Sequence, residues 1–166
     1  ITANQISKLA DSDDFENTYF IDLSVKTILA GVTDSLVERV VNNLGQNNIV
    51  VVHTSNTMKE FDGFSDETLN AGLTKSKVGY MITDFLANLT KAVINRKDAI
   101  LITLGGETSF KCCSAIDSFQ LQLVDEVAPA IAVSIDNKAQ WIVVKSGNLG
   151  TSNTLIDILK YFEQYE

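Results

Sequence analysis

Three short runs of aliphatic and β-branched residues constrain the fold of this chain more than any other feature. They cover residues 49–53, 99–104 and 141–144, and their apolar side chains are nearly continuous rather than alternating with polar ones. Strands of this kind suit a sheet that is covered on both faces, as parallel sheets are. Further strand-like runs lie at 18–22, 119–124 and 130–135.

Helical periodicity separates these runs. Apolar residues recur every three or four positions over 24–44, 76–95 and 153–165. A short helix is expected over 2–10, and another after Thr108. Strands that alternate with helices of this length predict an α/β fold, a layered helix–sheet–helix domain with a mostly parallel (mixed) sheet.

Two segments depart from this alternation. The runs 119–124 and 130–135 are too close together for a crossover helix, so we expect them to pair antiparallel or to form a peripheral hairpin. Residues 54–75 form the longest irregular stretch. Irregular segments of that length in a compact domain are usually functional or mobile.

Composition excludes several classes of protein. The 166 residues suit one domain, 1–166, and carry a net charge of −8 with no basic cluster, which argues against nucleic-acid binding. No apolar run approaches the roughly 20 residues of a membrane helix, and no signal peptide opens the chain. We therefore expect a soluble, cytoplasmic protein. The adjacent Cys112 and Cys113 provide no disulfide framework and are expected to fill the core.

Two of the buried runs end in similar loops. "GGETS" (105–109) follows one, and "KSGNLG" (145–150) follows the other. Ligands of open α/β sheets bind beyond the carboxyl ends of the strands. Helices expected to begin near Thr108 and Ser152 would offer unpaired N–H groups to an anion, and glycine lets a phosphate approach the backbone.

These loops have two interpretations. They hold the phosphates of a nucleotide, or they are ordinary turns in which Thr108 is only a helix N-cap. The chain contains neither a Walker A motif nor GxGxxG, so no generic fingerprint decides between them. The single histidine, His53, ends a strand, and its position favours a solvated strand terminus over a ligand contact.

A family resemblance favours the first interpretation. "GGETS" (105–109), "VAP" (127–129) and "VKSGNLG" (144–150), in this order and spacing, resemble the C-terminal nucleotide-binding domain of the four-carbon acid sugar kinase family (DUF1537-type). "ITANQI" (1–6) is similar to the Thr-x-x-Gln-Ile that follows a Gly-Ser-x-Ser strand end in that family. The chain departs from the pattern at Phe110 and Ala130, where the family has glycine, and at Leu149, where it has phenylalanine.

The resemblance implies a two-domain kinase whose C-terminal domain binds ATP. A four-carbon sugar acid, such as threonate, erythronate or an oxo-tetronate, would bind to an N-terminal domain expected upstream of Ile1, so this chain alone would be inactive. The implied cofactors are ATP and Mg²⁺, no catalytic residue is assigned, and a homo-oligomer stays open. The alternatives are a non-catalytic nucleotide- or anion-binding module, and a protein-interaction domain of the kind labelled Hrp-dependent outer protein, a type III effector.

The candidate nucleotide-binding residues come from both loops. Thr108 is the expected side-chain donor to phosphate, and Glu107 would contact ribose or hold Mg²⁺ through water. Lys145 either faces phosphate or pairs with a carboxylate. The full set is Gly105, Gly106, Glu107, Thr108, Ser109, Lys145, Ser146, Gly147, Asn148 and Gly150.

Overall fold

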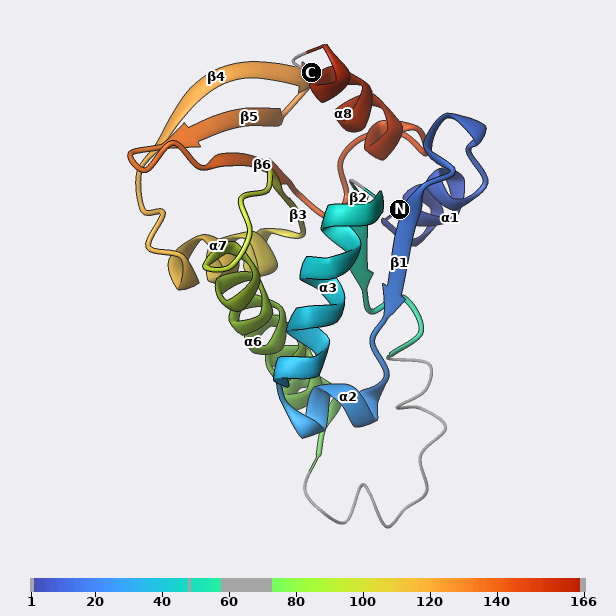
Figure 1. Cartoon of the computed structure of the whole chain (residues 1–166), viewed down its shortest axis with the longest axis vertical. Helices are drawn as coiled ribbons and strands as arrows, with labels where there is room; N and C mark the ends of the chain where they lie inside the picture. Colours follow the sequence, from blue (N-terminus) through green and yellow to red (C-terminus); the bar gives the residue numbers. More distant parts are fainter. Residues whose placement is uncertain (1, 48, 58–72, 165–166) are drawn as a thin grey trace. The chain divides into compact units, whose positions relative to one another are not determined.

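The computed structural model describes residues 2–47, 49–57 and 73–164 (Figure 1). It divides into two compact units, one formed by residues 1–16 with 98–166 and the other by residues 17–97. Most of the irregular segment expected at 54–75 lies outside the described residues. The assignment of 1–166 to one domain of a larger protein stays a prediction.

The unit of residues 17–97 contains a two-stranded parallel sheet. Strand β1 (Thr18–Asp22) pairs with β2 (Ile49–His53) in a register that runs from Thr18 opposite Ile49 to Asp22 opposite His53. Helices α2 (Val25–Ala30), α3 (Asp34–Asn47) and α6 (Lys75–Ile94) complete the unit. Their apolar faces meet in one core, which includes Ile21, Leu23, Val25, Ile28, Leu36, Val37, Val40, Val78, Ile82, Phe85, Leu89 and Val93.

The prediction of one helical segment over 24–44 is wrong, because the helix is interrupted at Gly31. Gly31 adopts a φ of +79° and donates its N–H to the carbonyl of Ile28, which ends α2. The next helix starts only after Thr33, whose hydroxyl accepts the N–H of Leu36 at 3.3 Å. The apolar spacing continues across this break, so periodicity alone did not reveal it.

The other unit contains a mixed four-stranded sheet in the order β3-β6-β5-β4. Strand β3 (Leu101–Leu104) is parallel to β6 (Trp141–Lys145), whereas β5 (Ile131–Asp136) is antiparallel to both β6 and β4 (Leu121–Ala128). The expected antiparallel pairing of the 119–124 and 130–135 runs is therefore confirmed, and so is the α/β class with a mixed sheet.

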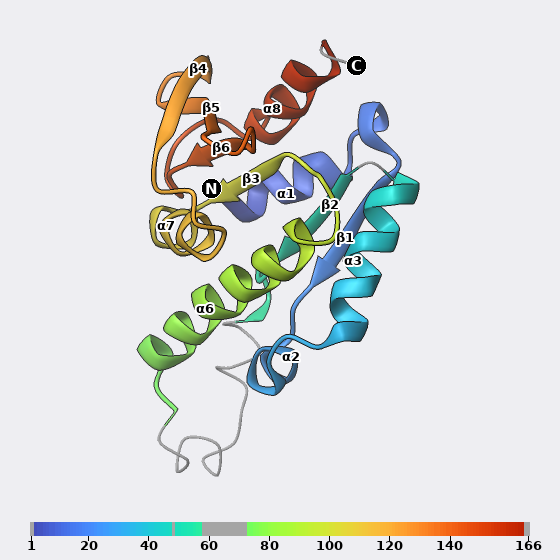
Figure 2. The same cartoon turned by 60° about the vertical axis from the view of Figure 1, so that its left-hand side comes forward.

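Helices cover both faces of this sheet. Helix α7 (Gly106–Ala115) packs on β3 and β6, while α8 (Thr154–Glu163) packs on β4 and on α1 (Thr2–Ala10), and Figures 1 and 2 show α7 and α8 on opposite sides. A short 3₁₀ helix, η1 (Asp13–Phe15), follows α1. Within the described ranges, no helix combines the length and apolarity needed to cross a membrane.

Candidate functional site

The first glycine loop is a direct turn from β3 into α7. Gly105 adopts a φ of +112° and occupies the N-cap position, so the helix begins at Gly106. Both the N–H and the hydroxyl of Ser109 donate to the carbonyl of Gly105, each at 2.8 Å. The N–H groups of Gly106, Glu107 and Thr108 therefore precede the first intrahelical bond and are available as donors at the positive end of the helix.

Thr108 is not the N-cap of this helix. The helix starts two residues earlier than expected, because the left-handed conformation of Gly105 lets the chain turn without a capping side chain. Thr108 lies in the first helical turn and is half-buried. Its expected role as a phosphate donor stays a prediction.

The second glycine loop runs from the end of β6 to the start of α8. The N–H of Leu149 donates to the carbonyl of Ser146 at 3.2 Å, and the N–H of Thr151 donates to the hydroxyl of Thr154 at 2.8 Å. These turns delay the helix, which begins at Thr154 and not near Ser152 as expected.

The structure brings the two loops together. Strands β3 and β6 are parallel neighbours with Leu104 opposite Lys145, so both loops leave the carboxyl edge of the same sheet. The N–H of Gly105 donates to the carbonyl of Lys145 at 2.8 Å. A Cβ on Gly147 would lie 4.0 Å from the Cα of Gly105. The ten residues predicted from the sequence therefore lie at one edge of this sheet, in three groups. Lys145 ends β6, Gly105 and the first turn of α7 provide five more, and the second loop provides Ser146, Gly147, Asn148 and Gly150.

The glycines of the site differ in what surrounds them. A Cβ on Gly150 would lie 2.2 Å from the hydroxyl oxygen of Thr154, and Gly150 also has a φ of +82°, so the fold itself requires glycine there. A Cβ on Gly106 would meet no atom within 4 Å, and one on Gly147 would only just reach Gly105. Neither Gly106 nor Gly147 has a positive φ. The backbone thus leaves open space at the same two glycines that a close-approaching phosphate would need.

Lys145 is fully buried, and its expected role toward phosphate stays a prediction. Its ammonium donates to the carbonyl of Ser146 at 2.9 Å, and no carboxylate of the described residues lies within ion-pair distance of it. Strand alternation places Lys145 on the same face of β6 as Trp141, whose ring contacts Phe162 of α8. Burial lowers the pKa of the Lys145 amine.

Two residues outside the predicted set hold the second loop in place. The hydroxyl of Thr2 donates to the carbonyl of Gly147 at 3.3 Å. The amide of Gln5 donates to the carbonyls of Leu149 at 3.3 Å and Thr151 at 2.7 Å. The available signal was the polar Gln5 on the buried face of the expected 2–10 helix, within the "ITANQI" segment.

Exposed side chains flank the first turn of α7. Glu107 forms an ion pair with Lys111 at 3.7 Å, one helical turn away. Phe110, which stands where the family pattern has glycine, is 73% exposed and so does not enter the core. Farther along α7, Cys112 and Cys113 are buried and form no disulfide, as expected, and burial raises the pKa of the Cys113 thiol.

His53 differs from its expected state as a solvated strand terminus. Its side chain is only 14% exposed, and Nδ1 lies 3.3 Å from Asp22 Oδ1, although the two atoms are not aligned as a hydrogen bond. The other carboxylate oxygen of Asp22 accepts from the amide of Asn56 at 2.7 Å. These residues belong to the unit of residues 17–97, whereas the glycine loops belong to the other unit.

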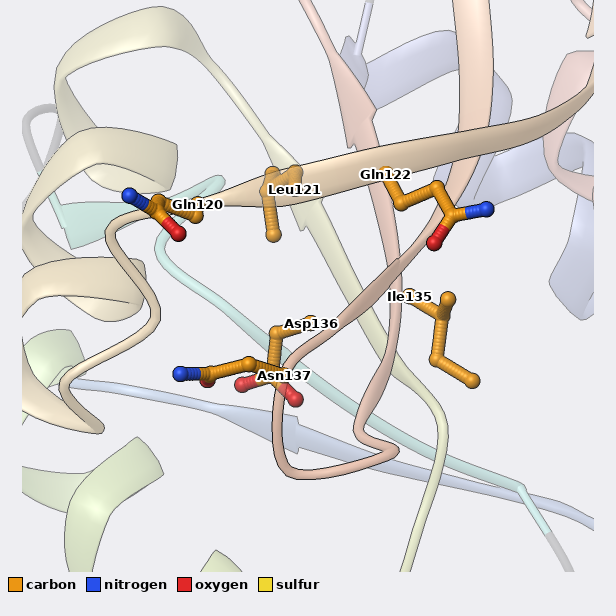
Figure 3. Close-up of a pocket in the computed structure, with 6 residues that line it drawn as sticks. All are labelled: Gln120, Leu121, Gln122, Ile135, Asp136 and Asn137. Carbon is orange, nitrogen blue, oxygen red and sulfur yellow. The ribbon is translucent and has the colours of Figure 1, made fainter.

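A shallow pocket lies where β4 begins and β5 ends (Figure 3). Its one charged group, the Asp136 carboxylate, accepts hydrogen bonds from the Ser118 hydroxyl and from the N–H groups of Lys138 and Gln140. Burial alone would raise the pKa of Asp136, but these bonds outweigh it and hold the pKa below its ordinary value. The carboxylate organises its own turn, so the pocket is a weaker candidate than the loops. Its lining residues are Gln120, Leu121, Gln122, Ile135, Asp136 and Asn137.

A family model described as a nucleotide-binding C-terminal domain matches residues 1–155. No curated protein matches the chain.

Several solved structures share the fold. A Haemophilus influenzae protein of the DUF1537 family is 16% identical with a TM-score of 0.73, and the match covers 97% of this chain and 37% of that one. A Salmonella typhimurium LT2 protein is 13% identical with a TM-score of 0.69, covering 96% and 38%. A Bordetella bronchiseptica DUF1537 domain, with bound citrate and as a domain-swapped dimer, is 15% identical with a TM-score of 0.61, covering 93% and 35%. The chain therefore spans less than two fifths of the length of these solved chains.

Proposed function

This chain belongs to the family of nucleotide-binding C-terminal domains, as its motifs predicted, and on that premise we propose that its two glycine loops hold the phosphates of ATP. The observation that carries the proposal is the open space at Gly106 and Gly147, beside the N-terminus of α7. Neither glycine is required by φ or by crowding, so a ligand that approaches the backbone closely gives a reason for both.

Each loop contributes a different kind of contact in this proposal. The N–H groups of Gly106, Glu107 and Thr108 and the Thr108 hydroxyl donate to phosphate oxygens. Ser146 adds a hydroxyl at the start of the second loop. Lys145, buried beneath that loop with a single carbonyl acceptor, supplies positive charge that an anion would stabilise.

Glu107 is the residue that fits a role toward Mg²⁺. Its carboxylate lies in the first turn of α7 and forms an ion pair with the partly exposed Lys111. Mg²⁺ keeps most of its waters and commonly binds through one or two carboxylates together with substrate phosphates. In this proposal Glu107 holds a water of that ion or contacts the ribose.

The whole protein would be a kinase that phosphorylates a four-carbon sugar acid of the threonate, erythronate or oxo-tetronate type. Its motif resemblance and its fold likeness to DUF1537 proteins, whose chains are more than twice as long, support this. The sugar acid would bind to the further domain that such a length accommodates. Positioning and charge stabilisation account for most phosphoryl-transfer catalysis, and the loops described above supply both. By analogy with the domain-swapped Bordetella bronchiseptica relative, we include a homodimer in the proposal.

Isothermal titration with ATP and Mg²⁺ tests the nucleotide site. The parent chain should release heat on binding, and a Thr108→Ala, Gly147→Ala double variant should bind at least tenfold more weakly. Gly79→Ala in α6 serves as the matched control, because a Cβ on Gly79 would meet no atom within 4 Å and Gly79 lies outside both loops. Equal ATP affinity of the parent and the double variant would remove the loops from the site.

A phosphate-transfer assay separates the kinase from a non-catalytic module. The protein at its natural length should transfer phosphate from ATP to threonate or a related acid. ATP binding without transfer to any four-carbon sugar acid would leave a binding module as the better description.

A further inference from the structure

Helix α1 is tied to the second glycine loop by side chains that all bond to carbonyl groups. Thr2 donates to the carbonyl of Gly147, and Gln5 donates to those of Leu149 and Thr151. Gln5 is fully buried and the two bonds that it donates are partly buried, so they are less exposed to competition from water than bonds at the surface. Three alternate carbonyls of one loop thus face a single helix.

The direction of those carbonyls determines the direction of the N–H groups that follow them. A trans peptide is planar, and its C=O and N–H point to opposite sides. Holding the carbonyls of residues 147, 149 and 151 toward α1 therefore turns the N–H groups of Asn148, Gly150 and Ser152 away from it.

Between Asn148 and Asn153, those three N–H groups are the ones left without acceptors. Within the described part of the chain, no atom accepts from Asn148, Gly150 or Ser152, and all three residues are exposed. The two N–H groups between them are used internally, Leu149 by the carbonyl of Ser146 and Thr151 by the Thr154 hydroxyl. The loop thus alternates satisfied donors with outward-facing ones.

The chemistry of Gln5 argues that this arrangement is not a packing accident. Its Oε1 atom is buried without a hydrogen-bond partner among the described residues. A buried polar atom without a hydrogen-bond partner destabilises a fold, and an apolar side chain of the same length would avoid that cost. Glutamine at this position is explained by its two donor hydrogens, which hold the loop.

We propose that residues 147–152 form a backbone phosphate cradle whose donors are the N–H groups of Asn148, Gly150 and Ser152, and that Thr2 and Gln5 are its positioning residues. Successive N–H groups pointing to one side make a concavity that binds anions. The inference rests on the proposed function in taking the phosphate to be that of ATP. It adds Ser152 to the ligand-binding residues and gives α1 a role in the site.

Amide NMR spectra of the chain, recorded with ATP and separately with inorganic pyrophosphate, test the cradle directly. The amide protons of Asn148, Gly150 and Ser152 should move downfield, and those of Leu149 and Thr151 should move less. Shifts with pyrophosphate but no ATP binding would support the cradle and count against the proposed function. ATP binding that leaves all three amides unmoved would overturn the cradle and leave the proposed function standing, and no shift with either ligand would also overturn it.

Two variants of α1 test the positioning role. Gln5→Met removes both donors but keeps the length of the side chain, and we expect ATP affinity to fall about tenfold or more. Leu9→Ala is the control, because it removes a buried apolar side chain of the same helix and leaves all three bonds to the loop in place. It should lower the melting temperature and leave the ATP dissociation constant unchanged.

The comparison stays decisive even if Gln5→Met does not fold. Thr2→Val then replaces it, since it removes only the bond to Gly147 from a partly exposed position, and it should selectively reduce the Asn148 amide shift. The positioning role would be overturned if Leu9→Ala lost as much ATP affinity as the Gln5 or Thr2 variant, because the loss of affinity would then follow from the loss of stability.

Discussion

Replacing Gly150 and Gly147 separately by alanine distinguishes a glycine that the fold needs from one that the ligand needs. In Gly150→Ala the new Cβ would lie 2.2 Å from the Thr154 hydroxyl oxygen and 3.0 Å from the Thr154 Cβ, in a residue with a φ of +82°. Thr154 is buried, and its hydroxyl accepts the N–H of Thr151. In Gly147→Ala the nearest atom is 4.0 Å away, an ordinary contact.

These contacts predict a large difference in the free energy of unfolding. A left-handed alanine costs about 1–2 kcal/mol. Forcing Thr154 aside adds overpacking of about 1–3 kcal/mol and weakens a hydrogen bond worth about 1 kcal/mol. We expect Gly150→Ala to lose about 3 kcal/mol or more, roughly 6–12 °C in Tm for a chain of this size. Gly147→Ala should change stability by no more than about 0.5 kcal/mol.

Urea unfolding followed by the fluorescence of the single tryptophan, Trp141 in β6, measures both variants in the unit that contains the site. ATP titrations of the same samples complete the comparison. Gly147→Ala should fold normally and bind ATP weakly. The reasoning is refuted if Gly150→Ala is as stable as the parent, or if Gly147→Ala is the less stable of the two.

Three further substitutions have measurable outcomes. Lys145→Met should raise the melting temperature at neutral pH and weaken ATP binding, because it removes a buried charge. Since burial lowers the pKa of Lys145, the difference in melting temperature between variant and parent should shrink as pH rises toward the ordinary pKa of lysine. A variant that is less stable than the parent would contradict this. Asp136→Asn should destabilise the fold above about pH 4, where the carboxylate is ionised in the unfolded chain too. The difference in stability between parent and variant should narrow as pH falls through the lowered pKa of Asp136. A difference in urea midpoints that does not change with pH would contradict this. Gly79→Ala should stabilise α6 by about 0.5–1 kcal/mol in thermal melts, since a Cβ there meets nothing, and a lower Tm would count against that geometry.

The sheet and the position of the loops could be read from the sequence because both depend on local patterns. The nearly continuous apolar runs at 99–104 and 141–144 became parallel neighbours, and that pairing by itself brings Gly105 against Lys145. The short separation of the β4 and β5 runs likewise required an antiparallel pair. Local periodicity failed at Gly31, where a single positive φ ends a helix whose apolar spacing continues.

The missed parts of the site depend on contacts between distant residues. Gln5 and Thr2 act on carbonyls that no motif describes, and only the packing of α1 brings them to the loop. The starts of α7 and α8 were misplaced because Gly105, Thr151 and Thr154 set them by backbone conformation and turn bonds rather than by hydrophobic pattern. Burial of Lys145 is likewise a product of the tertiary fold.

The route of the chain through its two units has a consequence for folding kinetics. Residues 17–97 form a continuous segment with its own core, so this unit can be completed while later residues are still being synthesised. The other unit joins the two ends of the chain, and the bonds from Thr2 and Gln5 to the loop span 144 to 146 positions. Contacts of such high sequence separation form slowly, because a long loop must close first. The binding loops should therefore mature late, acquiring their final shape only after the residues up to Ser152 have been synthesised and can reach α1.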